Sequence, residues 1–127
     1  MKNVLICDDQ VDIRDVVEML FEIDINDDID TTLHSANDGL EAIALLSKEI
    51  EFNLIICDMN MPNASGVDVY QFNQSHKNVP FILLSGDVES DIAKFEDHKT
   101  NEHFHAVKKP WQTNVFVELI KSELTSV

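Results

Sequence analysis

Polar side chains of the kinds that bind metal ions and phosphoryl groups occur at the ends of four segments rich in apolar residues. Asp8 and Asp9 follow the first of these segments. Asp58 follows the second, Ser85 the third and Lys109 the last. Oxygen ligands such as carboxylates are those that Mg²⁺ prefers, and a lysine with a serine hydroxyl suits phosphoryl oxygens. An aspartate in such a group has the chemistry of a nucleophile that forms an acyl phosphate.

Short apolar segments predict five β-strands, with a helix after each. An unbroken apolar run indicates a strand covered on both faces, and an alternating segment indicates an edge strand. The expected strands are 2–7, 29–35 (at the edge), 53–57, 80–84 and 104–109. The expected helices are 11–24, 40–49, one from residue 66 to the turn at Asn78, a weak polar one at 89–98, and one from Val115 to the C-terminus. Five successive β–α units predict an α/β protein, a doubly wound five-stranded parallel sheet with five helices on its two faces.

The topology of such a sheet explains why the polar side chains should meet. In a doubly wound sheet the first and third strands flank the topological switch point, and ligands bind at their carboxyl ends. Asp8, Asp9 and Asp58 would therefore lie together, and their repulsion would raise their pKa values. A divalent cation such as Mg²⁺ removes that penalty.

Composition limits the classes of protein to consider. The 127 residues suit one domain, residues 1–127, and the net charge of −15 argues against direct binding to nucleic acid or to an anionic membrane surface. No apolar run approaches the roughly 20 residues that span a bilayer, and the acidic start does not resemble a secretory signal, so a cytoplasmic location is expected. Cys7 and Cys57 close apolar strands and are expected to be buried thiols rather than a disulfide.

The motifs at the strand ends resemble those of the receiver domain of two-component response regulators (CheY-like). They are Asp8-Asp9, then Asp58-Met59-Asn60-Met61-Pro62 leading to Gly66, then Ser85-Gly86 and Lys109-Pro110. Each is weak alone, but their order at successive strand ends is specific, and the resemblance covers essentially the whole chain. It implies a flavodoxin-like sheet with strand order 2-1-3-4-5.

The resemblance also implies roles for the residues of the acidic end. Asp58 would be the phosphoacceptor and would receive the phosphoryl group from a sensor histidine kinase or a histidine phosphotransfer domain. Mg²⁺ would be bound by the carboxylates of Asp9 and Asp58 and by the backbone carbonyl of Asn60, with Asp8 acting through a metal-bound water.

Two further residues complete the implied site. Lys109 would pair with Asp58 and then with the phosphoryl oxygens. The peptide bond between Lys109 and Pro110 would be cis. Lys109 is preferred to Lys108 because the lysine of this family directly precedes the proline. Ser85 would bind the phosphoryl group. Phosphorylation would switch contacts with a downstream protein effector and could produce a phosphorylation-dependent dimer. The only chemistry would be self-phosphorylation from phosphodonors and self-dephosphorylation.

The sequence departs from the family pattern near the fifth strand. The family usually has Tyr or Phe three residues before the lysine, and here that residue is Ala106. His98, His103 and His105 also lie in this segment, and solvated histidines are expected rather than a metal site or a pH sensor. We hypothesise that this altered face marks an unusual partner. Asp87, two residues after Ser85, is a candidate for orienting the water that hydrolyses an acyl phosphate.

Two other functions compete with the phosphorylated switch. A degenerate receiver would act as a docking module that needs no phosphate, and Ala106 is the feature that favours it. A phosphatase of the haloacid-dehalogenase type also uses a strand-end aspartate and Mg²⁺. That family needs a second acid two residues after the nucleophile, where this chain has Asn60.

Overall fold

The computed structural model describes residues 1–95 and 99–125, and its centre is a five-stranded parallel sheet. The strand order is β2-β1-β3-β4-β5, which confirms the predicted doubly wound topology. The strands are β1 (Lys2–Cys7), β2 (Thr31–Ala36), β3 (Phe52–Asp58), β4 (Phe81–Ser85) and β5 (Phe104–Lys108).

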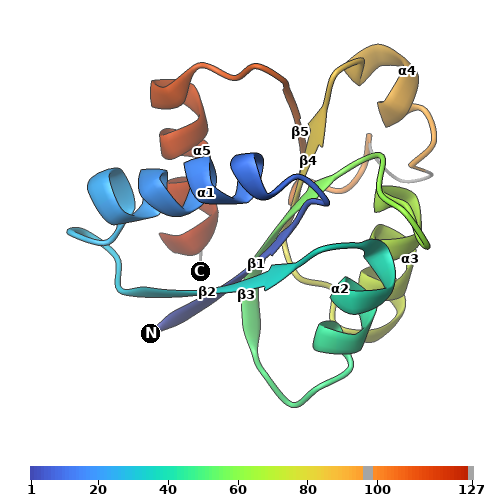
Figure 1. Cartoon of the computed structure of the whole chain (residues 1–127), viewed down its shortest axis with the longest axis horizontal. Helices are drawn as coiled ribbons and strands as arrows, with labels where there is room; N and C mark the ends of the chain where they lie inside the picture. The colour runs from blue at the N-terminus through green and yellow to red at the C-terminus, as the bar shows by residue number, and fades with distance from the viewer. Residues whose placement is uncertain (96–98, 126–127) are drawn as a thin grey trace.

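Helices cover both faces of this sheet (Figure 1). They are α1 (Val11–Leu20), the π-helical turn η1 (Phe21–Ile25), α2 (Gly39–Leu46), α3 (Gly66–His76), α4 (Val88–Ile92) and α5 (Thr113–Thr125). In Figure 1, α1 and α5 lie on one side of the strands, and α2 and α3 lie on the other. Within the part of the chain that the structure describes, no helix has the length and apolar character to cross a membrane.

The side-chain alternation of the strands divides the core into two layers. Residues such as Leu5, Ile55 and Phe81 pack with α2 and α3, whereas their sequence neighbours pack with α1 and α5. Because a strand sends successive side chains to opposite faces, one unbroken apolar run supplies both layers. Cys7 and Cys57 lie opposite each other on β1 and β3 as buried free thiols, as expected.

Several helix and strand ends differ from the predictions. The helix expected at 11–24 is α-helical only to Leu20 and continues as the π turn η1, which ends at Ile25. The helix expected at 40–49 ends at Leu46, and a turn follows in which the Ser47 hydroxyl donates to the Ile43 carbonyl at 2.8 Å. The edge strand expected at 29–35 is displaced to Thr31–Ala36.

The largest error concerns the helix expected at 89–98. The helix α4 ends at Ile92, and a turn over Ala93 and Lys94 brings Phe95 into the core with 1% of its surface exposed. The segment is polar on most positions, so burial of Phe95 decides its path rather than helical periodicity. Residues 96–98 of this prediction lie outside the described residues.

The packing of α3 against the end of β3 gives a test of the fold. A Cβ added at Gly66 would lie 2.7 Å from the Asp58 carbonyl oxygen and 3.1 Å from Met59 Cα. We expect Gly66→Ala to lower the free energy of unfolding by about 1–3 kcal/mol in urea denaturation, because backbone must shift to admit the methyl group. Gly86→Ala is the control, since an added Cβ there meets nothing within 4 Å, and its effect should stay within about 0.5 kcal/mol. An equal loss in both variants would contradict this account.

Candidate functional site

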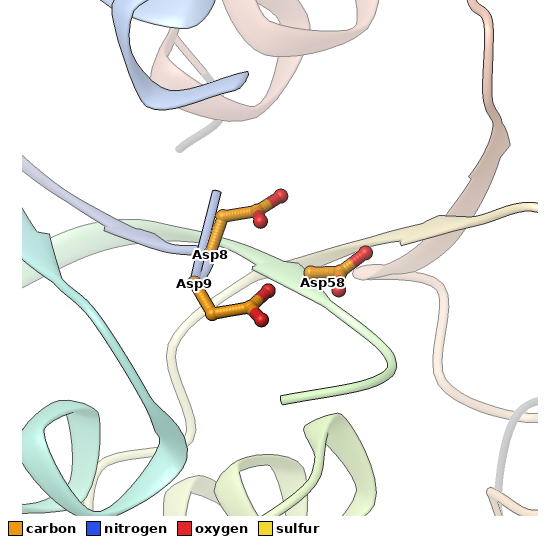
Figure 2. Close-up of side chains that lie close together, drawn as sticks. All are labelled: Asp8, Asp9 and Asp58. Atoms are coloured by element: carbon orange, nitrogen blue, oxygen red, sulfur yellow. The ribbon is translucent and has the colours of Figure 1, made fainter. Parts of the chain in front are cut away.

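Three carboxylates converge at the carboxyl ends of β1 and β3 (Figure 2). Asp8 and Asp9 follow β1, and Asp58 is the last residue of β3. The two strands pair in parallel, with Cys7 opposite Cys57, so their next residues emerge side by side. Each aspartate offers an oxygen within 4.8 Å of the others, so the three predicted acids do form one cluster.

Asp8 is the most buried of the three acids, with 1% of its surface exposed. Its Oδ1 accepts a hydrogen bond of 2.9 Å from the backbone N–H of Gln10, but its Oδ2 accepts none from any residue that the structure describes. Burial raises the pKa of the Asp8 carboxyl above its usual value; the Gln10 N–H opposes this effect, and the charge of Asp58 adds to it. The charge of Lys109 lowers the pKa of Asp8 only in part, so the net effect on this carboxyl is still an increase.

Lys109 supplies the cation of the site. Its ammonium forms a direct ion pair with Asp58 Oδ1 and lies 3.9 Å from Asp8 Oδ2. Its backbone N–H donates to the Ser85 carbonyl at 2.8 Å, which fixes the residue beside the end of β4 although β5 itself stops at Lys108. Lys108 is exposed, so the structure brings the predicted lysine to Asp58 and turns its neighbour away. The bond between Lys109 and Pro110 is cis, as the family resemblance implies.

Ser85 lies at the end of β4, but a second acid holds its hydroxyl. The Ser85 Oγ donates a 2.6 Å hydrogen bond to Asp91 Oδ2 and accepts one of 3.0 Å from the Asp87 N–H. Both Ser85 and Asp91 are buried. The sequence predicts Ser85 at the site but carries no signal for Asp91.

A cavity of about 340 Å³ opens between these strand ends. It is lined by Asp9, Gln10, Asp58, Met59, Asn60, Ser85, Gly86 and Lys109. Larger cavities lie between α3 and Lys94, at about 460 Å³, and between β5 and α5, at about 550 Å³. The chemistry of the lining, rather than its size, marks this cavity as the candidate site.

Asp87 does not line this cavity. Its carboxylate caps α4 by accepting a 3.3 Å hydrogen bond from the Ser90 N–H. This position gives no support to the hypothesis that Asp87 orients a hydrolytic water. Asn60 does lie on the cavity wall, as expected, with an exposed side chain.

The donor set fits a hard divalent cation. The three carboxylates and the one ammonium of Lys109 leave a net charge of −2 when all are ionised, which one Mg²⁺ would neutralise. The unpartnered Asp8 Oδ2 is a buried acceptor that a metal-bound water would satisfy.

Ala106 replaces the aromatic residue of the family pattern, and other rings fill the core next to it. Tyr70 packs edge-on against Phe81, Phe95 and Phe104, with ring centroids 5.1–5.2 Å apart. These four residues, here called the aromatic cluster, come from α3, β4, the turn after α4 and β5. Ala106 is partly buried and packs against the hydrophobic core to which they belong.

The expectation of solvated histidines is incomplete, because the side chains of His103 and His105 are 44% and 27% exposed but also contact a buried acid. The Nδ1 of His103 lies 3.1 Å from Glu123 Oε2, and the Nε2 of His105 lies 2.8 Å from Glu123 Oε1. Glu123 is a buried acid on α5, so the histidines join β5 to that helix. Among the described residues, the three aspartates are the one group with ligand atoms close enough to share a metal ion. His98 lies outside the described residues.

Sequence reasoning missed two partners of the site besides Asp91. Gln10 donates its N–H to Asp8 Oδ1, and Arg14 donates to the Asp8 carbonyl at 2.5 Å. Gln10 is the residue between the acid pair and α1. Backbone N–H groups at the start of a helix commonly donate to a nearby side-chain oxygen, so the sequence could have predicted this contact. Arg14 gave no such signal, because its contact depends on the angle between β1 and α1.

The burial of Asp8 predicts that its charge destabilises the metal-free protein. Because the pKa of Asp8 is raised in the folded state, the native protein binds the proton of this carboxyl more tightly than the unfolded chain does. The contribution of Asp8 to the free energy of unfolding is therefore present below the usual pKa and is lost as pH rises. In EDTA at pH 7, we expect Asp8→Asn to raise the free energy of unfolding by about 1 kcal/mol. The gain should shrink as pH falls toward 4.

Thermal unfolding of Asp8→Asn beside Asp15→Asn measures this effect. Asp15 is exposed on α1, so its variant makes the same change of charge without removing a buried carboxylate. A loss of stability in Asp8→Asn at neutral pH, or a gain equal to that of Asp15→Asn, would contradict the assignment.

Comparison with known proteins identifies the family. The family model for the response regulator receiver domain matches residues 4–121. The probable transcriptional regulator ycf27 of Porphyridium aerugineum is 33% identical over 97 residues, which cover 75% of this chain and 38% of that protein. A protein-glutamate methylesterase/protein-glutamine glutaminase of Methanococcus maripaludis is 37% identical over 83 residues, which cover 65% of this chain and 22% of that protein. The chain thus spans well under half the length of these curated relatives.

Solved structures agree with this match. The signal receiver domain of an HD domain-containing protein from Pseudomonas fluorescens Pf-5 is 26% identical, with a TM-score of 0.79 over 97% of this chain and 86% of that chain. The chemotaxis protein CheY4 of Vibrio cholerae shares the fold, with 23% identity and a TM-score of 0.77 over 98% of this chain and 99% of that chain. Since the matched residues 4–121 include every strand end that builds the site, the chain belongs to the family of response regulator receiver domains.

Proposed function

We propose that this chain is a phosphorylation-dependent switch in which Asp58 accepts the phosphoryl group. The observation that carries the proposal is the setting of the Asp58 carboxylate. It forms an ion pair with Lys109, lies within 4.8 Å of the acids Asp8 and Asp9, and lines the cavity at the carboxyl edge of the sheet.

The proposed step is an in-line transfer. A carboxylate oxygen of Asp58 attacks the phosphorus of a phosphohistidine, and the P–N bond breaks as the P–O bond of the acyl phosphate forms. The electron pair of the broken bond remains on the imidazole nitrogen. The ammonium of Lys109, which already contacts Asp58, lies where it would neutralise charge on the transferred oxygens.

Mg²⁺ is the metal that this site would hold. The carboxylates of Asp9 and Asp58 and the backbone carbonyl of Asn60 would bind it directly, and Asp8 would act through a bound water. When bound, the ion supplies positive charge that offsets the repulsion between the carboxylates and the incoming phosphoryl group. The unpartnered, buried Oδ2 of Asp8 supports this assignment.

The partners follow from the family. Receiver domains work with histidine kinases and effector domains, and they are generally phosphoacceptors rather than enzymes in their own right. We infer a histidine kinase or a histidine phosphotransfer domain as the donor and a protein effector as the target. The groove between β5 and α5, which Ala106 and the exposed Val115 line, is a candidate surface for output contacts.

A docking module that needs no phosphate is the second candidate, because Ala106 removes the ring through which the family usually reports phosphorylation. A pull-down with the protein before and after treatment with acetyl phosphate separates the two functions. Partners that bind only the phosphorylated form support the switch, and an unchanged set of partners supports the docking module.

Phosphorylation itself gives the main test. Incubation with acetyl phosphate and Mg²⁺ should add the mass of one phosphoryl group to the intact protein, and EDTA should prevent it. Asp58→Asn should take up no phosphate, because the nucleophile is gone, whereas the exposed-site control Asp15→Asn should behave as wild type. Phosphate that persists in Asp58→Asn, or none in wild type, would overturn the proposal.

The two adjacent lysines provide a matched pair. Lys109→Ala should slow phosphorylation by acetyl phosphate about 100-fold, because it removes the cation beside the developing charge. Lys108→Ala removes the same charge from an exposed position and should change the rate less than twofold. Initial rates from intact mass measure both, and equal slowing in the two variants would show that Lys109 acts only through net charge.

A further inference from the structure

The hydrogen bond between Ser85 and Asp91 joins the candidate site to α4. The Ser85 Oγ donates to Asp91 Oδ2 at 2.6 Å, and the two residues are 1% and 8% exposed. Hydrogen bonds to a charged acceptor in a buried setting are among the stronger ones in proteins. Asp91 lies on α4, whose five residues provide little helical stability of their own.

The hydroxyl of Ser85 cannot serve two acceptors at once. A serine hydroxyl has one proton to donate, and its oxygen already accepts a hydrogen bond from the Asp87 N–H at 3.0 Å. While the proton points to Asp91, it is not available to an oxygen on the Asp58 side. Binding of a phosphoryl oxygen by Ser85 therefore requires that the bond to Asp91 break.

We infer that Asp91 is a positioning residue that holds Ser85 away from Asp58 in the unphosphorylated protein and carries the signal to α4. The inference rests on the proposed function. When the Ser85 hydroxyl turns to a phosphoryl oxygen, Asp91 is left as a buried carboxylate without its strongest donor. A buried charge in that position is costly, so α4 shifts until Asp91 reaches solvent or moves closer to Lys94, which already contacts its Oδ1 at 3.4 Å.

Lys94 contacts the other oxygen of the Asp91 carboxylate and would remain its partner after Ser85 turns away. Its ammonium lies 3.4 Å from Asp91 Oδ1, one helical turn further along the chain, and its side chain is 54% exposed. The next residue, Phe95, is anchored in the aromatic cluster against Tyr70. The chain from Asp91 to Phe95 is therefore held at both ends, by the Ser85–Asp91 hydrogen bond and by the Phe95 ring. Loss of the first contact would let α4 move while Phe95 stays in place. This route needs no aromatic side chain at Ala106.

Binding of beryllium fluoride with Mg²⁺ measures the competition, because it occupies the place of a phosphoryl group on an aspartate. Removing the competing acceptor should free the Ser85 hydroxyl. We expect Asp91→Ala to lower the concentration for half-maximal binding about tenfold. Asp91→Asn, which keeps an oxygen acceptor but loses the charge, should give an intermediate value. Glu89→Ala removes an exposed acid from the same helix and should match wild type.

A double-mutant cycle shows whether the effect passes through Ser85. In the Ser85→Ala background, Asp91→Ala should no longer change the affinity for beryllium fluoride, since no hydroxyl is left to release. A tenfold gain that persists without the hydroxyl would overturn the inference, because it would show a general effect of charge. Asp91→Asn serves the same cycle should the alanine variant not fold.

Hydrogen exchange of the amides of residues 88–95 tests the transmission. Beryllium fluoride should speed exchange there at least threefold in wild type, while Asp91→Ala should exchange faster from the start and change little on binding. If wild type binds beryllium fluoride but Asp91→Ala shows the same exchange rates as wild type, the role of Asp91 would be overturned and the phosphoacceptor proposal would remain intact. Absence of both phosphate uptake and beryllium fluoride binding in wild type would overturn both.

Discussion

Repulsion between carboxylates at one edge of the sheet is the constraint on which the rest of the structure depends. Parallel pairing of β1 and β3 forces Asp8 and Asp58 together, and burial of Asp8 leaves one of its oxygens without a donor among the described residues. Lys109, which follows β5 at the same edge of the sheet, offsets part of this charge. A bound divalent cation would offset the negative charge that Lys109 leaves unbalanced.

A second buried acid, Asp91, contacts the site at the end of β4. Asp91 draws the Ser85 hydroxyl toward α4, whereas Lys109 draws Asp58 toward β5. Asp58, Ser85 and Lys109 line one cavity, but the Ser85 hydroxyl donates to Asp91 and the Asp58 carboxylate pairs with Lys109. In the proposed switch, the Ser85 hydroxyl would have two alternative acceptors, Asp91 and a phosphoryl oxygen, and these would define its two arrangements.

The segment from α4 to α5 departs from the family pattern and is held by contacts of its own. The rings of Tyr70, Phe81, Phe95 and Phe104 pack together in the core against which Ala106 packs, and His103 and His105 contact Glu123 on α5. These contacts fix β5 to its neighbours without the usual aromatic residue. The departures in sequence thus correspond to a different set of packing and polar contacts in this region.

The sequence alone determined the order of strands and helices along the chain and the meeting of Asp8, Asp9 and Asp58, because apolar runs mark strands and parallel strands end at one edge. The choice of Lys109 over Lys108 came from the family resemblance, since the lysine of this family directly precedes the proline. The sequence did not determine where α2 and α4 end; in the structure a turn at Ser47 follows α2, and a turn that buries Phe95 follows α4. Only the tertiary structure paired Ser85 with Asp91 and the histidines with Glu123. Such pairs depend on side-chain direction and distance between elements, and neither composition nor periodicity carries that information.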